Sequence, residues 1–228
     1  MKFAWQQIPS SSITELLCLS TCDGIVLDTE HSLWNEQTVS LCLSIIKWSG
    51  KSAYVRLGEV NKLVISKALD AGADGLIFST IETPEQLRKI KSYANYPIYG
   101  GTRGLGLVRS NSWGDDNLMS KRKPIIIPQI ETVTGVKNIE AIYSEGADFF
   151  LVGPYDLSSS LGIPGDFENE VFRHEIQKIY KAVPKENLAI HIPDNVQSHI
   201  SKYSDWGLLA LGMDTSSLIE KNKELFGG

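Results

Sequence analysis

Two carboxylates stand out in this chain because each comes shortly after an apolar run with the character of a buried strand. Glu131 follows the β-branched run Ile125–Ile130, and Asp156 follows the run Phe149–Val152. The segment Thr134–Glu145 between them has helical periodicity, so the two strands are expected to be parallel, with their carboxyl ends at one edge of a sheet. Because neighbouring strands lie about 4.8 Å apart, the two carboxylates can share one cation.

The residue types indicate which cation that is. Two carboxylates that leave several coordination positions open suit Mg²⁺ or Mn²⁺, which keep water ligands and accept substrate oxygens. Such an ion polarises a carbonyl group and stabilises the enolate formed beside it. Schiff-base chemistry would instead need a desolvated lysine at the same edge. No strand segment contains one, since Lys51 precedes its strand and Lys137 lies in a helical segment. The metal route is therefore expected.

Further ionisable residues belong to the second and third expected strands. Asp28, Glu30 and His31 come at the end of the second strand, and Arg56 lies in the third. His31 is suited to proton transfer near neutral pH, and Asp28 could fix its tautomer. Arg56 is a donor for a carbonyl or a developing oxyanion. Alternatively, Arg56 could pair with Asp28 or Glu59 only to hold loops.

Eight short apolar runs that alternate with helical segments must position these residues. No linker or shift in composition divides them, so we expect a single (β/α)₈ TIM barrel over residues 1–228. An open doubly wound sheet is the alternative, but no glycine-rich phosphate fingerprint follows a strand. The expected strands are Phe3–Gln7, Gly24–Asp28, Ala53–Leu57, Gly75–Ser79, Ile125–Ile130, Phe149–Val152, Leu188–Ile192 and Leu208–Gly212.

In such a barrel the catalytic residues lie at the carboxyl ends of the strands. The ionisable residues described above all belong to that rim, and we expect no comparable group at the opposite rim. Each residue alone could be a helix cap or a loop residue. Their convergence on one rim predicts a functional site.

Composition excludes some other classes of function. The chain has 228 residues, 42% hydrophobic, a net charge of −5, and no basic tract beyond Lys121–Lys123, so nucleic acid and acidic membrane are unexpected partners. No apolar run is long enough to span a membrane, and the N-terminus lacks the features of a signal peptide. The odd set of cysteines, Cys18, Cys22 and Cys42, is expected to be reduced, which points to the cytoplasm. The long Gly-rich segment Tyr96–Lys123 is expected to be functional.

Six sequence segments resemble one family along nearly the whole chain. They are LDTEH, YVRL, KALDAGADG, RGLG, PQIETVTGV and GPYDLSSSLG, and they are similar to segments of the HpcH/HpaI aldolases. These are class II, metal-dependent pyruvate aldolases of the 4-hydroxy-2-oxoheptane-1,7-dioate and 2-keto-3-deoxy-sugar-acid type. The resemblance implies a barrel of the phosphoenolpyruvate/pyruvate-binding type and a carbon–carbon lyase (an aldehyde-lyase). The reaction it implies is reversible cleavage of a 4-hydroxy-2-oxo acid to pyruvate and an aldehyde.

The resemblance also implies roles for individual residues. Glu131 and Asp156 would bind Mg²⁺ or Mn²⁺, with Co²⁺ as a further candidate. His31 would be the base, with Asp28 behind it, and Arg56 would lie at the keto oxygen.

Other matched positions extend the site and point to an assembly. Gln129 would line the pocket, and the backbone of Gly153, Pro154 and Tyr155 would receive the pyruvate carboxylate. Asp70 would lie at an interface, which implies a homo-oligomer, with a hexamer as the state to test. From its own surroundings, Arg103 could contact a substrate hydroxyl or carboxylate, or could brace the long loop.

The chain departs from the family pattern on the side of the pocket where the aldehyde is expected. The segment LGEVNKL follows Arg56 in place of a tryptophan-asparagine-aspartate turn, and Ser79-Thr80 replace a proline-methionine pair. The aldehyde therefore stays open, and His191 could line its pocket. The alternatives are a metal–enolate lyase of the citrate-lyase or malyl-CoA-lyase type, and a non-catalytic barrel used as a binding protein.

Overall fold

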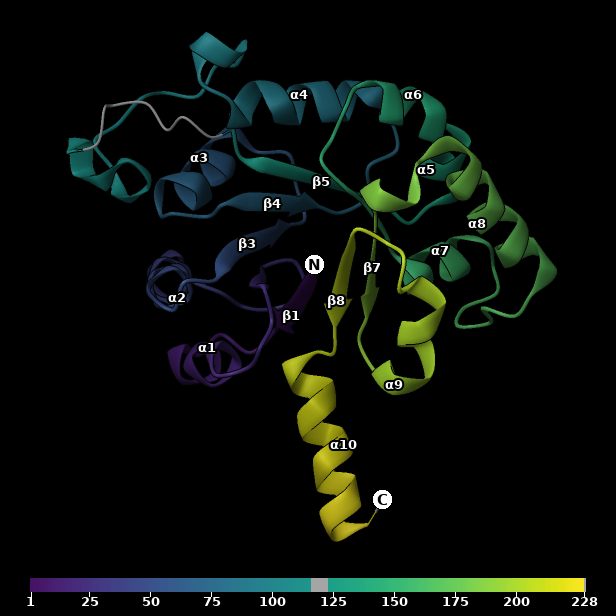
Figure 1. Ribbon diagram of the computed structural model, residues 1–228. Coiled ribbons are helices and arrows are strands. Elements are labelled where there is room, and N and C mark those ends of the chain that lie inside the picture. Colours follow the sequence, from purple (N-terminus) through teal and green to yellow (C-terminus); the bar gives the residue numbers. More distant parts are fainter. Residues whose placement is uncertain (116–122, 228) are drawn as a thin grey trace.

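The computed structural model describes residues 1–115 and 123–227, in which eight parallel strands form a closed barrel (Figure 1). Each strand pairs with its neighbours in sequence, and β8 pairs with β1 to close the sheet. The barrel expected from the sequence is confirmed, and the open sheet was the wrong alternative. The strands are β1 (Lys2–Gln6), β2 (Gly24–Asp28), β3 (Ser52–Leu57), β4 (Gly75–Phe78), β5 (Ile125–Ile130), β6 (Phe150–Val152), β7 (Leu188–Ile192) and β8 (Leu208–Leu211).

Helices surround the barrel, and several begin at a side chain that accepts a backbone N–H of the first turn. Asn35, Asn61, Thr83 and Asn169 are such caps. The α-helices are α1 (Ser11–Cys18), α2 (Glu36–Trp48), α3 (Lys62–Asp70), α4 (Pro84–Ala94), α5 (Val133–Lys137), α6 (Ile139–Ser144), α7 (Pro154–Ser160), α8 (Glu170–Ala182), α9 (Val196–His199) and α10 (Asp214–Phe226). Short 3₁₀ segments are η1 (Pro97–Tyr99), η2 (Arg109–Gly114), η3 (Lys185–Asn187) and η4 (Ile200–Tyr203).

Apolar side chains fill two separate spaces. One cluster lies inside the barrel and includes Phe3, Trp5 and Tyr54. The larger cluster lies between the strands and the helices and includes Ile25, Leu76 and Phe150. Because both faces of the strands are covered, their sequences read as continuous apolar runs instead of alternating ones.

The amino-terminal ends of the strands carry a repeated device that the sequence analysis did not anticipate. Asp23 lies just before β2, Asp74 just before β4 and Asp148 just before β6. Each carboxylate accepts a backbone N–H from the start of the preceding strand, which is β1, β3 or β5 respectively. These hydrogen bonds measure 2.7, 2.8 and 2.9 Å. The expectation that this rim holds no group of ionisable residues is therefore wrong. These carboxylates accept backbone N–H groups that would otherwise lack a partner at the strand starts.

The helices of the second half of the barrel differ from the expected ones. The expected helix Thr134–Glu145 is divided into α5 and α6 at Asn138, and α7 begins directly after β6. Helix α10 projects away from the barrel (Figure 1). Part of the long Tyr96–Lys123 segment, including two residues of its basic tract, lies outside the described residues. Among the helices described, none has the length and hydropathy needed to cross a bilayer.

Candidate active site

Glu131 and Asp156 line the same cavity, which has a volume of about 320 Å³. Glu131 directly follows β5, as expected, whereas Asp156 lies in the first turn of α7, beyond the end of β6. The short helix therefore turns Asp156 back over the barrel mouth. The other lining residues are Glu30, His31, Thr80, Thr132, Ser159 and Ser160.

Both oxygens of the buried Glu131 carboxyl accept hydrogen bonds. The backbone N–H and the hydroxyl of Thr80 donate to Oε1 at 2.6 and 2.8 Å, and the side-chain amide of Gln129 donates to Oε2. Burial raises the pKa of Glu131 to about 7, the negative charges of Asp156 and Glu30 add to this rise, and the bonds from Thr80 oppose it. Because burial favours the protonated carboxyl, a cation in place of that proton would compensate the buried charge of Glu131.

Thr80 contacts Glu131 directly, and the sequence analysis noted it only as a departure from the family. Its φ of 53° lies in the left-handed region, which costs a β-branched residue free energy. This backbone turn lets both its N–H and its hydroxyl reach one oxygen of Glu131. The side chain of Gln86 donates to the Thr80 carbonyl at 3.3 Å and so supports the turn.

Arg56 and Asp28 form a buried pair inside the barrel. Nε of Arg56 donates to Oδ1 of Asp28 at 2.9 Å, and Nη2 donates to Oδ2 at 2.6 Å. The indole N–H of Trp5 donates to Oδ2 at 3.2 Å, and the Arg56 guanidinium lies 5.0 Å from the Trp5 ring. Burial alone would raise the pKa of Asp28, but the hydrogen bonds and charge of Arg56 hold it below its ordinary value.

His31 is placed at the cavity, but its partner is not the one expected. Its Nε2 lies 3.7 Å from Oε2 of Glu30, and its side chain is 58% exposed. Asp28 accepts only the backbone N–H of His31, at 3.3 Å, because both carboxylate oxygens face Arg56 and Trp5. The structure does not show the expected contact between Asp28 and the His31 ring, and Glu30 takes that place. Glu30 also lies 3.1 Å from Nη1 of Arg56.

The segment that begins α7 passes close to Gln129 and Glu131. A Cβ on Gly153 would lie 2.8 Å from Nε2 of Gln129 and 2.8 Å from Oε2 of Glu131, so only glycine fits there. Next to it, Pro154 opens α7, and the hydroxyl of Tyr155 points to Asp194 at 3.4 Å. The structure thus places Gln129, Gly153 and Glu131 in direct proximity.

His191 supports the Arg56–Asp28 pair from inside the barrel. Its ring stacks on Trp5 with 4.1 Å between centroids, and its Nε2 lies 3.3 Å from the Gly212 carbonyl oxygen. Burial lowers its pKa to about 4, so the ring is neutral at physiological pH. His191 lines a small separate cavity with Tyr155 and Asp194, not the cavity of Glu131.

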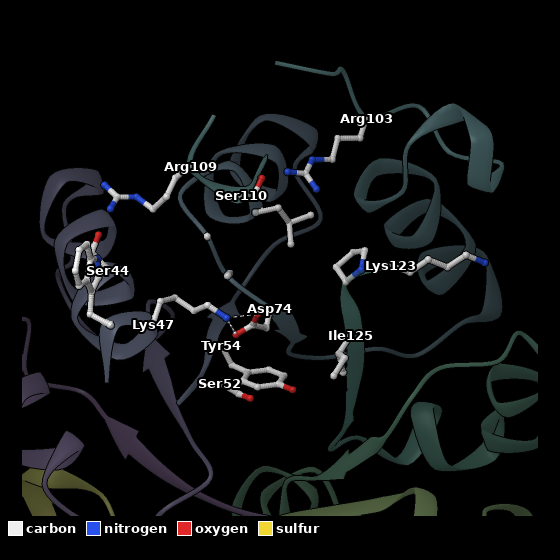
Figure 2. A pocket seen from close by; sticks show the side chains of 15 residues that line it. Ser44, Lys47, Ser52, Tyr54, Asp74, Arg103, Arg109, Ser110, Lys123 and Ile125 are labelled. Atoms are coloured by element: carbon white, nitrogen blue, oxygen red, sulfur yellow. Dashed lines mark hydrogen bonds and ion pairs between the residues drawn. The ribbon is translucent and has the colours of Figure 1, made fainter. Parts of the chain in front are cut away.

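Arg103 and Asp70 lie elsewhere. They form an ion pair of 2.6 Å, and Arg103 lines a cavity of about 440 Å³ that also borders Asp74 and the starts of β3 and β5. In Figure 2 the Arg103 side chain points toward Ser110, while Lys47 reaches Asp74. The structure therefore does not bring Arg103 or Asp70 to the Glu131 cavity of their own chain.

The residues at the Glu131 cavity fit a hard divalent cation. The donors are carboxylate oxygens, and within the described residues no cluster of three or more His, Cys, Asp and Glu side chains is arranged around one metal position. Two protein ligands leave positions for water and substrate, as Mg²⁺ and Mn²⁺ prefer. Oε1 of Gln129 is buried without a hydrogen bond, which leaves a polar atom available to a bound group, whereas Oε2 of Glu30 is ion-paired with Arg56 at 3.1 Å.

Comparison with known sequences gives one consistent result. The model of the HpcH/HpaI aldolase/citrate lyase family matches residues 4–220. A 5-keto-4-deoxy-D-glucarate aldolase of Klebsiella pneumoniae is 32% identical over 92% of this chain and 84% of its own length. The enzyme of the same name from Salmonella paratyphi C is 30% identical over 97% of this chain and 89% of its own length.

Solved structures agree with the sequences. A HpcH/HpaI aldolase/citrate lyase family protein from Burkholderia cenocepacia superimposes with a TM-score of 0.89 and 26% identity, over 99% of this chain and 92% of that one. The citrate synthase SbnG gives a TM-score of 0.84 and 26% identity, over 98% and 90% of the two chains. Macrophomate synthase, at 21% identity and a TM-score of 0.82 over 100% of this chain and 86% of its own, shares the fold.

Proposed function

This chain belongs to the HpcH/HpaI aldolase/citrate lyase family and is a carbon–carbon lyase, and on that premise we propose how its own residues cleave a 4-hydroxy-2-oxo acid. The products are pyruvate and an aldehyde. The observation that carries the proposal is the buried Glu131 carboxyl, with its raised pKa, beside Asp156 in a cavity that His31 also lines. We assign the single domain of residues 1–228 to this one activity.

Glu131 and Asp156 would hold the divalent cation of this family, Mg²⁺ or Mn²⁺. When bound, the cation supplies Lewis acidity to the keto group of the substrate. Thr80 and Gln129 fix the Glu131 carboxylate, and a carboxylate held by such neighbours loses little conformational freedom when it becomes a ligand.

His31 would move the proton. In the cleavage direction it takes the proton of the 4-hydroxyl, the bond between C3 and C4 breaks, the aldehyde leaves, and the electron pair remains as the enolate of pyruvate. A proton returned to C3 then gives pyruvate. Oε2 of Glu30, 3.7 Å from Nε2 of the ring, would orient the imidazole.

Arg56 would stabilise the negative charge of the enolate oxygen. A guanidinium has five N–H donors, and Asp28 accepts two of them, so the remaining N–H groups can serve Glu30 and the substrate. Because Asp28 and Trp5 fix the guanidinium before substrate arrives, little reorganisation is needed during the reaction.

Gln129 and the backbone from Gly153 to Tyr155 would receive pyruvate itself. The close approach of Gly153 to Gln129 and Glu131 leaves no room for a side chain at that position, so the backbone there is not covered by a side chain of its own. This placement agrees with the role that the family resemblance implies for the segment.

The test is pyruvate release from a panel of 4-hydroxy-2-oxo acids, with Mn²⁺ and with EDTA. We expect release that EDTA abolishes and that Mn²⁺ restores. Release unaffected by EDTA would contradict the metal route. Activity confined to acyl-CoA or citrate would favour the citrate-lyase alternative, and binding without turnover would favour a non-catalytic barrel.

We also propose a homo-oligomer in the cytoplasm. Helix α10 projects from the barrel with Leu218, Ile219, Leu225 and Phe226 exposed, a surface that an interface would cover. Asp70, beside the exposed long loop, would lie at such an interface. The free thiols of Cys18, Cys22 and Cys42 suit a reducing compartment. Light scattering that shows only a 25.2 kDa monomer would contradict the assembly.

A further inference from the structure

From the charges around the Glu131 cavity we infer that the aldehyde partner is an uncharged, hydroxylated aldehyde, and that aldehydes with a carboxylate are disfavoured. This inference rests on the proposed function, and it specifies the half of the substrate that the family resemblance leaves open. It follows from which side chains line the cavity and from which charges are already compensated.

The lining residues beyond the proposed metal ligands are polar and hydroxyl-rich. Thr132, Ser159 and Ser160 each contribute a hydroxyl-bearing side chain. The Thr132 hydroxyl is already used within the chain, because it donates to Glu82 at 2.8 Å and accepts the backbone N–H of Gly135 at 3.0 Å. The Ser160 hydroxyl accepts the backbone N–H of Val133 at 3.1 Å. Ser160 therefore keeps its own O–H to donate, and the hydroxyl of exposed Ser159 has no hydrogen-bond partner among the residues described. Such groups can pair with substrate hydroxyls.

The same cavity has no cation to spare for a second carboxylate. Among its lining residues in the described part of the chain there is no lysine or arginine, and His31, which can take up a proton there, is assigned to proton transfer. The nearest guanidinium, Arg56, is bound to Asp28 at 2.6 and 2.9 Å and faces Glu30 at 3.1 Å.

The charge balance at the site is negative even with a metal ion bound. A divalent cation offsets Glu131 and Asp156, and Arg56 offsets only one of Asp28 and Glu30, which leaves about one net negative charge before pyruvate adds another. Beyond the cavity, Asp194 stands at the hydroxyl of Tyr155. A second substrate carboxylate would face these charges in a partly desolvated site, where repulsion is stronger than in water.

Two aldehydes of the same size isolate the effect of charge. D-glyceraldehyde and tartronate semialdehyde differ by a terminal hydroxymethyl group in place of a carboxylate. In the Mn²⁺-dependent addition of pyruvate to the aldehyde, we expect kcat/KM for D-glyceraldehyde to exceed that for tartronate semialdehyde by about 10- to 100-fold. Repulsion between one pair of like charges in such a site corresponds to a ratio of about this size. Propionaldehyde, which lacks the hydroxyls, is expected to react more slowly than D-glyceraldehyde.

A substitution at Ser159 tests the cause. Ser159→Arg places a cation at the cavity wall and should move the ratio toward tartronate semialdehyde by about tenfold. Ser159→Gln, which adds length without charge, should leave the ratio of the two aldehydes unchanged. An unchanged ratio in Ser159→Arg, or an equal shift in both variants, overturns the charge argument.

Deuterium exchange into the methyl group of pyruvate separates this inference from the proposed function, because exchange requires no aldehyde. Exchange together with equal or better use of tartronate semialdehyde overturns the inference and leaves the pyruvate aldolase intact. No exchange and no addition to any aldehyde overturns the proposed function and the inference with it. Exchange retained in the Ser159 variants shows that they are folded.

Discussion

The two ends of the barrel each carry a cavity lined by charged residues, but the sign of the charge in excess differs between them. At the amino-terminal end, the larger cavity of about 440 Å³ is lined by one carboxylate, Asp74, and by the cations Lys47, Arg103, Arg109 and Lys123. Asp74 pairs with Lys47, and Arg103 pairs with Asp70 beside the cavity. Figure 2 shows the first of these pairs across the cavity. At the carboxyl-terminal end, the smaller cavity of about 320 Å³ has carboxylates in excess of cations.

The comparison teaches that a buried carboxyl without a cationic partner is a better sign of chemistry than the size of a cavity. Asp74 accepts hydrogen bonds from the Lys47 ammonium and from a backbone N–H of β3, so its negative charge is compensated by groups of the fold itself. Glu131 accepts hydrogen bonds but no ion pair with a cationic side chain is found for it in the described part of the chain, and its burial raises its pKa. A buried carboxyl without a cation costs stability, and function is the usual reason to retain it.

The largest expected effect comes from removing a carboxylate at each end. Glu131→Gln or Asp156→Asn should reduce Mn²⁺ affinity by more than about 100-fold and abolish pyruvate release, because a neutral amide is a poor ligand for a hard cation. Asp74→Asn is the matched control, and it should lose about 1–2 kcal/mol of stability while Mn²⁺ affinity is unchanged. Calorimetric titration of Mn²⁺ measures the first effect, and urea unfolding measures the second. Equal Mn²⁺ affinity in all of these proteins would remove the distinction between the two ends.

His31 should matter for proton transfer and not for the metal. His31→Ala should slow deuterium exchange into pyruvate by about 10²- to 10⁴-fold, the usual range for loss of a general base, with Mn²⁺ affinity retained. Proton NMR of pyruvate in D₂O follows the exchange. A variant that exchanges at the parent rate would move the base role to another residue, and Glu30 would then be substituted.

The raised pKa of Glu131 predicts how the stability of the metal-free protein depends on pH. The folded-state pKa of about 7 exceeds the ordinary value of 4.5, so between these values the folded state binds more protons than the unfolded state. The contribution of Glu131 to the free energy of unfolding therefore falls as pH rises from about 4.5 to 7, by about 2–3 kcal/mol in all.

Urea unfolding in EDTA from pH 5 to pH 8 measures this dependence. The difference between the parent and Glu131→Gln isolates the contribution of Glu131, since the other titrating groups are common to both. Above pH 7, Glu131→Gln should be the more stable protein. A difference that does not change with pH would show that the carboxyl is ionised throughout.

The smallest expected effect concerns Thr80, which supports Glu131 without binding the metal itself. Thr80→Val keeps the backbone N–H bond but loses the hydroxyl, and we expect Mn²⁺ affinity to fall by about 10-fold, as for other residues that hold a metal ligand. Thr80→Ser should restore the affinity. Ser79→Ala serves as the control, because the Ser79 hydroxyl faces the Leu57 carbonyl and not Glu131. Equal affinity in Thr80→Val and the parent would reduce Thr80 to a structural residue.

The sequence was sufficient to predict the architecture because the determinants of the barrel are local. Eight apolar runs, each bounded by turns and followed by a helical segment, allow few arrangements that bury both faces of a sheet. The bounds of β2, β5 and β7 agree with the expected ranges. Helix α7 was missed because its seven residues, Pro154–Ser160, are too few to show a period, although a proline in the first turn is a typical start.

Residue types and order along the chain also indicated which side chains gather at the rim. Glu131, Asp156, Glu30 and His31 could be placed there because parallel strands bring their carboxyl ends together. Their partners could not be assigned in the same way. Whether Asp28 faces the ring of His31 or the guanidinium of Arg56 depends on the tilt and register of β2 against β3, and these follow from closure of the whole barrel.

Only the tertiary structure decided the remaining features of the site. Three contacts join segments that no local sequence pattern relates. They are the contact of Thr80 with Glu131, which its positive φ allows, the stack of His191 on Trp5, and the ion pair of Arg103 with Asp70. The physical reason is the range of the interactions. Hydrophobic burial follows a period that is written locally in the sequence, whereas a hydrogen bond or a charge pair depends on distances of a few ångströms between strands, which exist only once the barrel has closed.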